Sequence, residues 1–381
     1  MKPNTSHIPF NLPYIHPDLP SFIKDVASSH NFFRNQGPFY QKIKQQLSQW
    51  IKHTNIFPTP SCTNALEIAA MVLDIKPGDE IILPSYTFSS TANAFVLRGA
   101  VLRFADVLPH FPSLDPLSVK QQITIRTKAL VWVHYGGQAT ATKEILEICK
   151  KHNIVLIEDA AQAIGAYHND TSLGTLGDLS AISFHETKNL GCAQGGALIV
   201  NNPIFLEKAM HHLQCGTNRH DFMGGKTSAY TWVNKGSNGI LAEPLCAILS
   251  FHLEYLDEVN NRRRKLWHTY YQHLSPLADK NIQTGIADSG GNGHIFYLLF
   301  SNRKIRDQYK NKLIDKGIQT TTHYEPLHKS PFFSISQGRV VLPQTEKFGD
   351  GLLRLPLHHY LKDNEQMYLI EEIMRLSQSI N

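Results

Sequence analysis

The stretch Ile154-Val155-Leu156-Ile157-Glu158-Asp159 decides the fold, because four aliphatic side chains follow one another and then give way to two carboxylates. A continuous apolar run of this length suits a strand that is buried on both faces, as in a parallel sheet covered by helices. Similar runs occupy residues 80–83, 129–133 and 197–200, and stretches with helical spacing separate them. The sequence therefore predicts an α/β fold with a largely parallel sheet.

The polar residues that end these runs are the places to look for chemistry. In open α/β sheets, ligands bind beyond the carboxyl ends of the strands. Four strand ends carry unusually informative residues: Pro84-Ser85-Tyr86-Thr87-Phe88, His134-Tyr135-Gly136-Gly137, Glu158-Asp159-Ala160-Ala161-Gln162 and Phe184-His185-Glu186-Thr187-Lys188.

Length and composition predict two domains. The chain has 381 residues, of which 42% are hydrophobic and 18% charged, as in an ordinary soluble enzyme. A boundary is expected near residues 236–239, which gives a large domain over 1–238 and a smaller α+β domain over 239–381. In the second part, residues 294–300 read as a strand, and residues 305–316 and 363–378 read as helices.

Several classes of protein are disfavoured. The five cysteines are widely spaced and form no C-x-x-C pair, which favours a reducing compartment over a disulfide scaffold or a zinc site. The start of the chain lacks an apolar signal segment, so we expect a cytoplasmic protein without a membrane partner. The net charge of +5 is scattered, and the basic run at 262–265 suits a solvated helix face, so no nucleic acid partner is expected. The histidines show no metal-ligand spacing, and we expect no metal.

The strand ends offer what pyridoxal phosphate asks of a protein: a lysine for its aldehyde, a carboxylate for its ring nitrogen, an anion site and a flat surface. Lys188 follows the predicted strand 181–184, and only a lysine can serve the aldehyde. A lone lysine is more often an exposed surface residue, and its position beside three other strand ends favours the cofactor. Asp159 could hold the ring nitrogen or cap a following helix, and the two interpretations are equally weighted.

The anion site and the flat surface for the ring also have candidate residues near strand ends. Residues 59–63 precede the helical run 64–70, so free amides and hydroxyls gather at a helix N-terminus, which suits a phosphate. An ordinary capped helix is the alternative. Ser183 adds a hydroxyl, and Gln162 could reach the phenolic oxygen of the ring. Phe88 or Tyr86 could stack on the ring, or either could be a core aromatic.

Taken together, Ser61-Cys62-Thr63, residues 84–88, residues 158–162 and Ser183-Phe184-His185-Glu186-Thr187-Lys188-Asn189 resemble the DegT/DnrJ/EryC1/StrS family of sugar aminotransferases. Residues 8–11, 76–80, 89–95, 292–294 and 352–357 look like the branch that makes dTDP-4-amino-4,6-dideoxygalactose. The resemblance covers nearly the entire chain.

This resemblance implies the aspartate aminotransferase-like fold (pyridoxal-phosphate-dependent fold type I) and a homodimer with active sites at the subunit interface. It also implies transfer of an amino group from L-glutamate to C4 of dTDP-4-keto-6-deoxyglucose, in polysaccharide biosynthesis. The implied roles are Lys188 as Schiff-base lysine and proton shuttle; Asp159 and Gln162 at the ring; Phe88 stacked on it; Cys62, Thr63 and Ser183 at the phosphate, with Asn238 from the other subunit; and His323, Tyr324 and His328 near the substrate.

The chain departs from the family pattern in three places. The loop after Lys188 is one residue shorter than usual, with Gln194 where an acidic residue is expected. Gly239-Ile240 stands where many relatives carry an arginine, and residues 242–246 differ from the usual Ser-Glu-Leu-Gln-Ala. The alternatives are a transaminase acting at C3 or on another nucleotide sugar, and a non-catalytic sensor that keeps the fold. A dehydratase of this fold would have histidine in place of Lys188.

Overall fold

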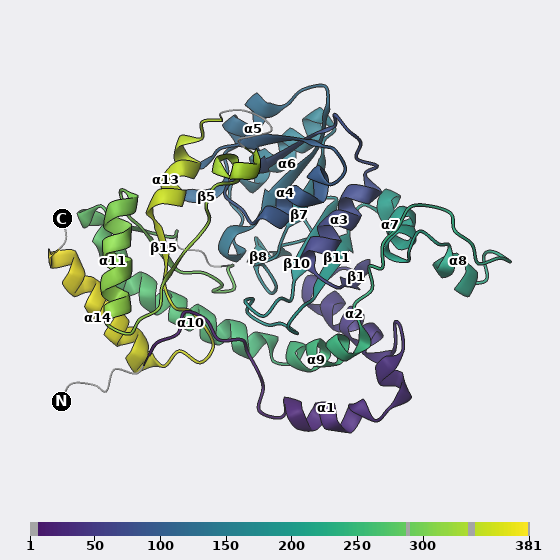
Figure 1. Cartoon of the computed structure of the whole chain (residues 1–381), viewed down its shortest axis with the longest axis horizontal. Coiled ribbons are helices and arrows are strands. Elements are labelled where there is room, and N and C mark those ends of the chain that lie inside the picture. The colour runs from purple at the N-terminus through teal and green to yellow at the C-terminus, as the bar shows by residue number, and fades with distance from the viewer. Residues whose placement is uncertain (1–6, 287–289, 334–339, 380–381) are drawn as a thin grey trace.

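The computed structural model describes residues 7–286, 290–333 and 340–379. Its main feature is a mixed sheet of seven strands, drawn at the centre of Figure 1. Five neighbouring strands run parallel, and β11 lies antiparallel to both of its neighbours. The predicted α/β fold with a largely parallel sheet is confirmed. In spatial order the strands are β1 (Ile56–Thr59), β11 (Gly196–Val200), β10 (Leu179–Ser183), β7 (Val155–Asp159), β6 (Thr127–Val133), β2 (Glu80–Pro84) and β3 (Val101–Ala105).

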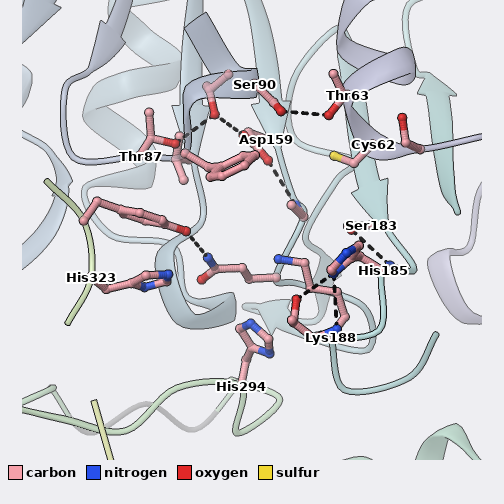
Figure 2. A pocket seen from close by; sticks show the side chains of 18 of the residues that line it. Cys62, Thr63, Thr87, Ser90, Asp159, Ser183, His185, Lys188, His294 and His323 are labelled. Carbon is pink, nitrogen blue, oxygen red and sulfur yellow. Dashed lines mark hydrogen bonds between the residues drawn. The ribbon is translucent and has the colours of Figure 1, made fainter. Parts of the chain in front are cut away.

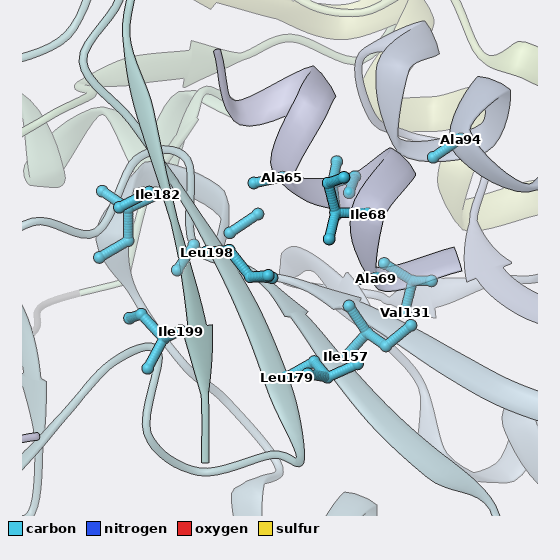
Figure 3. Packing of buried hydrophobic residues seen from close by; sticks show 14 of the residues in the cluster. Ala65, Ile68, Ala69, Ala94, Val131, Ile157, Leu179, Ile182, Leu198 and Ile199 are labelled. Carbon is cyan, nitrogen blue, oxygen red and sulfur yellow. The ribbon is translucent and has the colours of Figure 1, made fainter. Parts of the chain in front are cut away.

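Both faces of this sheet are covered, which explains the unbroken apolar runs. Val131 and Ile157 point into one hydrophobic cluster, whereas Leu130 and Leu156 point into another on the opposite face. Figure 3 shows helix α3 packed on the first face. The first cluster draws on α2 (Pro38–Ile51), α3 (Cys62–Val72), α4 (Ser89–Val96), α7 (Leu206–Leu213) and α9 (Glu243–Leu253), and the second on α5 (Pro116–Gln122) and α6 (Thr142–His152).

A smaller antiparallel sheet follows in the order β12 (Gln283–Thr284), β13 (Tyr297–Leu299), β15 (Leu352–Arg354) and β14 (Thr321–Thr322). It has a hydrophobic cluster of its own, to which Ile8 from the start of the chain contributes. The predicted division between residues 238 and 239 stays a prediction, and α9 packs with the large sheet. The helices of the second cluster are α10 (Leu256–Leu274), α11 (Arg303–Asp315) and α14 (Asp363–Ser379).

The strand expected over 294–300 begins only at Tyr297, so that prediction was wrong at its start. Gly293 has a φ of +65°, and a Cβ there would lie 2.6 Å from the backbone of Arg263. The chain at 292–294 is therefore pressed against α10 and cannot extend as a strand. The helices expected over 305–316 and 363–378 are confirmed as α11 and α14.

In the described ranges, no helix has the length and apolar character needed to cross a membrane.

Short elements connect the two sheets and their helices. The connecting elements are α1 (Leu19–Ala27), η1 (His30–Phe33), β4 (Val107–Leu108), β5 (Phe111–Leu114), η2 (Tyr135–Gly137), β8 (Tyr167–His168), β9 (Thr171–Ser172), η3 (Pro203–Phe205), α8 (Arg219–Met223), η4 (Ser275–Lys280), η5 (Leu327–Lys329) and α13 (Pro343–Gly351).

Candidate active site

A cavity of about 400 Å³ lies where the carboxyl ends of the large sheet meet the smaller sheet. That volume is within the usual range for a small-molecule site. Lys188 and Asp159 line the same cavity, as the sequence interpretation requires. Figure 2 shows both side chains among its lining. Nine predicted site residues line it: Cys62, Thr63, Phe88, Asp159, Gln162, Ser183, Lys188, His323 and Tyr324.

Asp159 ends strand β7 and is buried, with both carboxylate oxygens engaged. Thr91 Oγ1 donates to Oδ2 at 2.7 Å, and the amide of Ala161 donates to Oδ1 at 3.2 Å. The Thr87 hydroxyl in turn lies 2.8 Å from that of Thr91. Residues 160–165 form turns, so Asp159 caps no helix. These bonds hold the carboxylate in one orientation, at the edge of the cavity.

Lys188 stands in the loop after strand β10, and its amide donates to the carbonyl of His185 at 2.9 Å. Burial lowers the pKa of Lys188 below its ordinary value, the neighbouring Cys62 and Asp159 raise it, and Arg354 lowers it. The neutral amine is therefore more accessible than on an exposed lysine. A lysine in this state can act as a nucleophile and as a proton carrier.

The N-terminus of α3 opens into the same cavity. Ser61 caps the helix by accepting from the amide of Asn64 at 3.0 Å. The amides of Cys62 and Thr63 bond to no other described residue, and the Thr63 hydroxyl lies 2.7 Å from that of Ser90. Gly196 lets β11 approach, because a Cβ there would lie 2.3 Å from the nitrogen of Cys62. Free amides at a helix N-terminus favour an anion such as phosphate.

The opposite wall of the cavity comes from the smaller sheet and its loops. Gln162 donates through Nε2 to the Tyr324 hydroxyl at 3.1 Å and accepts through Oε1 from the amide of Gly136 at 2.6 Å. The His323 ring stacks on that of Tyr324, with centroids 3.7 Å apart. Gln162 therefore links the turn after Asp159 to this second wall.

Arg354, in strand β15, places a cation in the cavity wall. The sequence analysis did not single out this residue. Its guanidinium donates to Nε2 of His323 at 3.2 Å and lies 4.9 Å from the centroid of the Phe10 ring. Its Nε is buried without a hydrogen bond to any described residue. Burial lowers the pKa of Arg354, and no described carboxylate acts on it. An unpaired cation in a cavity favours an anionic ligand.

Two predicted site residues lie outside the cavity of the single chain. Asn238 is exposed and pairs with Gln214 in an isolated β-bridge. His328 is buried, where its Nδ1 lies 2.8 Å from the Ser85 hydroxyl and its Nε2 lies 3.4 Å from Glu346. Their predicted roles at the phosphate and at the substrate stay predictions.

Comparison with known proteins identifies the class of this site. The model of the DegT/DnrJ/EryC1/StrS aminotransferase family matches residues 20–374. The chain belongs to this family. Because the family uses pyridoxal phosphate, the chain is a pyridoxal-phosphate-dependent aminotransferase with fold type I. An amine, a carboxylate and an open helix N-terminus around one cavity fit that cofactor.

Three relatives of this aminotransferase are each 33% identical to it. A pleiotropic regulatory protein of Geobacillus stearothermophilus matches over 94% of both chains. The dTDP-4-dehydro-2,3,6-trideoxy-D-glucose 4-aminotransferase of Saccharopolyspora spinosa matches over 83% of this chain and 82% of its own. The UDP-N-acetyl-3-dehydro-alpha-D-glucosamine 3-aminotransferase of Acidithiobacillus ferrooxidans covers the same shares. The crystal structure of the aminotransferase TlmJ from Streptoalloteichus hindustanus superposes with a TM-score of 0.89 at 27% identity, covering 98% of this chain and 99% of that one.

The aminotransferase cavity also contains residues that the sequence analysis did not assign to it. Gln194, the departure from the family pattern, lines the cavity beside the positive-φ residue Ala193. Thr87, His185 and Thr187 stand in the strand ends quoted from the sequence, where they were given no role. Ser90 and Thr91 of α4 and Arg354 of the second wall carried no comparable signal. The unassigned lining residues with polar or aromatic side chains are Phe10, Asn11, Ser61, Thr87, Ser90, Thr91, His185, Thr187, His294 and Arg354.

Proposed function

We propose that the chain transfers the amino group of L-glutamate to C4 of a nucleotide-linked 4-keto-6-deoxy sugar. The specific reaction is dTDP-4-keto-6-deoxyglucose to dTDP-4-amino-4,6-dideoxygalactose, for polysaccharide biosynthesis. The observation that carries the proposal is the shared cavity of Lys188 and Asp159 beside the open N-terminus of α3. The names of two 33%-identical relatives describe aminotransferases of nucleotide-linked sugars, which supports the substrate class.

The cofactor supplies an aldehyde that takes up an amino group and a ring that withdraws electrons from the reacting carbon. The backbone amides of Cys62 and Thr63, with the hydroxyls of Thr63 and Ser183, would hold its phosphate. Phe88 would cover a ring face, and Gln162 would meet the phenolic oxygen. Asp159, oriented by Thr91, would keep the ring nitrogen protonated, because a nearby negative charge favours the charged form.

Lys188 carries the chemical role. Its amine would hold the aldehyde of the cofactor, and when free it would accept and return a proton at Nζ. Burial favours the neutral amine at Nζ, which is the form that can accept that proton.

Arg354 and His323 suit the amino donor. The free Nε of Arg354 would bind a carboxylate of L-glutamate, since charge-assisted bonds to guanidinium are among the strongest in proteins. His323 accepts from Arg354 and so holds the guanidinium in place. Burial, with Arg354 and Lys188, holds the pKa of His323 well below its ordinary value, so that His323 adds no repulsion between like charges.

A homodimer with shared active sites is part of the proposal. Met223 and Trp232 are 73% and 77% exposed in the segment around α8, which Figure 1 shows projecting from the end of the molecule opposite to α14. Exposed apolar side chains of this kind mark association surfaces. Packed on a second copy, this arm would bring Asn238 toward the phosphate site of the partner. Sedimentation of the wild type and of a Trp232→Ser variant tests the association.

The decisive experiment is a titration of the purified protein with pyridoxal phosphate bound. L-glutamate should bleach the visible absorption band, and the keto sugar should restore it. Offering dTDP-4-keto-6-deoxyglucose and the corresponding 3-keto sugar separates C4 from C3 transfer, an alternative that the 3-aminotransferase relative favours. Failure of glutamate to bleach the band would leave the non-catalytic sensor as the better account.

A further inference from the structure

His294 is a buried histidine in the cavity wall that the proposed mechanism leaves without a role. It is 4% exposed, it lines the cavity, and its charge would interact with that of Lys188. Figure 2 shows the His294 ring on the same side of the cavity as the Lys188 side chain. It comes from the irregular segment 290–296, on the wall that belongs to the smaller sheet.

The hydrogen bonds around His294 fix its tautomer. Asn189, the residue after Lys188, donates through Nδ2 to the backbone carbonyl of Asn292 at 2.9 Å, which places its amide nitrogen on that side. Its Oδ1 therefore faces Nδ1 of His294 at 2.7 Å. A carbonyl oxygen only accepts, so Nδ1 must carry the hydrogen. In the neutral ring, Nε2 is then left with a free lone pair.

The backbone of His294 is held as firmly as its ring. Arg263 donates to the carbonyls of Gly293 and His294 at 3.2 and 2.9 Å. The amide of His294 donates to Oδ1 of Asn292, whose Nδ2 donates to the carbonyl of Gln162 at 2.9 Å. The imidazole is thus tied to the loops of both Lys188 and Asp159 before any ligand arrives.

Nε2 of His294 forms no hydrogen bond with any side chain in the described ranges. Burial, followed by the charges of Lys188, Arg263 and Arg354, keeps the pKa of His294 well below its ordinary value. A neutral imidazole that carries its hydrogen on Nδ1 can only accept a hydrogen bond at Nε2. Its lone pair would repel a phosphate or carboxylate and attract a hydroxyl.

We propose that His294 Nε2 accepts a hydrogen bond from a sugar hydroxyl on the carbon next to the keto carbon, and so selects substrates that carry it. This inference rests on the proposed function. The amine of Lys188 must reach the keto carbon, and His294 lies on the side of that amine, so a neighbouring hydroxyl is the group within reach. A sugar without the hydroxyl would leave Nε2 buried and unpaired, which enzymes use to reject such analogues.

His294→Asn is the diagnostic change. Its amide can replace Nδ1 as donor to Asn189 and offers nothing in the place of Nε2. The two half-reactions are measured separately: bleaching by L-glutamate, then amination of dTDP-4-keto-6-deoxyglucose or of dTDP-4-keto-3,6-dideoxyglucose, which lacks the C3 hydroxyl. We expect kcat/KM for the hydroxylated sugar to fall about tenfold, and the rates with glutamate and with the deoxy sugar to stay near wild type.

His294→Gln is the matched variant, because its amide can reach the place of Nε2 and should recover part of the loss. An equal loss with both sugars would overturn the inference and make His294 a structural link. A slower glutamate half-reaction would also overturn it, since the imidazole would then act on Lys188. A wild type that bleaches with glutamate and aminates neither sugar would refute the substrate proposal itself, and the inference with it.

Discussion

The two walls of the cavity differ in how they are built. One wall consists of strand ends of the large sheet, with Asp159 and Lys188 held by backbone bonds and by the hydroxyl of Thr91. The other consists of loops and a short strand of the smaller sheet, with His294, His323 and Arg354. The first wall places an acid and an amine, and the second places a cation and neutral acceptors.

Under the proposed function, this difference separates cofactor binding from substrate recognition. A cofactor that stays bound needs a carboxylate and an amine at fixed positions, which a rigid sheet edge supplies. Substrates that enter and leave need charge and hydrogen-bond matching, which the second wall offers. Substitutions in the first wall should therefore impair both half-reactions, whereas those in the second should impair one.

The largest effect is expected for Lys188→Ala. Removing the amine that is proposed to hold the cofactor and carry the proton should lower turnover by about 10³-fold or more in both half-reactions. The exposed Lys151→Ala in α6 serves as a matched control and should keep full activity. Stopped-flow absorption measures both half-reactions. Substantial turnover without the Lys188 amine would refute its role.

A smaller loss is expected for Asp159→Asn. The neutral amide no longer favours a protonated ring nitrogen, so both half-reactions should slow by roughly 10²-fold. Thr91→Val removes one hydrogen bond to the carboxylate and should cost about fivefold. If Asp159→Asn changed only the step with the sugar, Asp159 would belong to substrate recognition.

Arg354→Gln tests the second wall. Loss of the cation should raise KM for L-glutamate by about tenfold to a hundredfold and leave amination of the sugar near wild type. Arg354→Lys, which keeps the charge without the planar fork, should recover part of the loss. Steady-state kinetics with each substrate varied would show the split. An increase confined to KM for the sugar would assign Arg354 to the nucleotide.

The smallest effect concerns acid stability. His323 has a pKa well below its ordinary 6.5, because of burial and then of Arg354 and Lys188. Below about pH 6.5 the unfolded chain binds a proton there that the folded chain does not, so stability falls as the pH drops. In His323→Gln this loss should be smaller by about 1 kcal/mol per pH unit. Urea unfolding at pH 7.5 and 5.5 measures it, and identical slopes would contradict the explanation.

The first wall could be predicted from the sequence because its residues follow apolar runs. The runs ending at Leu83, Ile157 and Val200 were recognisable as strands. Asp159 stands at the end of one strand, and Lys188 stands in the loop that follows β10 (Leu179–Ser183). β11 reads like a parallel strand although it is antiparallel, because it too is buried on both faces. A continuous apolar run therefore indicates that a strand is buried on both faces, and it does not indicate the direction of the strand.

The second wall was harder to predict because its residues have no such context. Arg354 ends a strand of three residues, where a cation reads as a surface residue. His294 fell inside the strand expected over 294–300. The hydrogen bonds from Arg263 of α10 to the carbonyls of Gly293 and His294 hold this part of the chain in an irregular conformation. Long-range contacts of this kind leave no local periodicity. The fold and the residues at the strand ends could therefore be predicted from the sequence pattern, whereas His323 and Tyr324 were expected only through the family resemblance and Arg354 and His294 were not assigned.

The most direct test of this account is a crystal structure with pyridoxal phosphate bound. Continuous density should join Nζ of Lys188 to the aldehyde carbon of the cofactor, with a carboxylate oxygen of Asp159 within hydrogen-bond distance of the ring nitrogen. A cofactor attached elsewhere, or a ring nitrogen turned away from Asp159, would contradict the claim that the strand-end wall holds it.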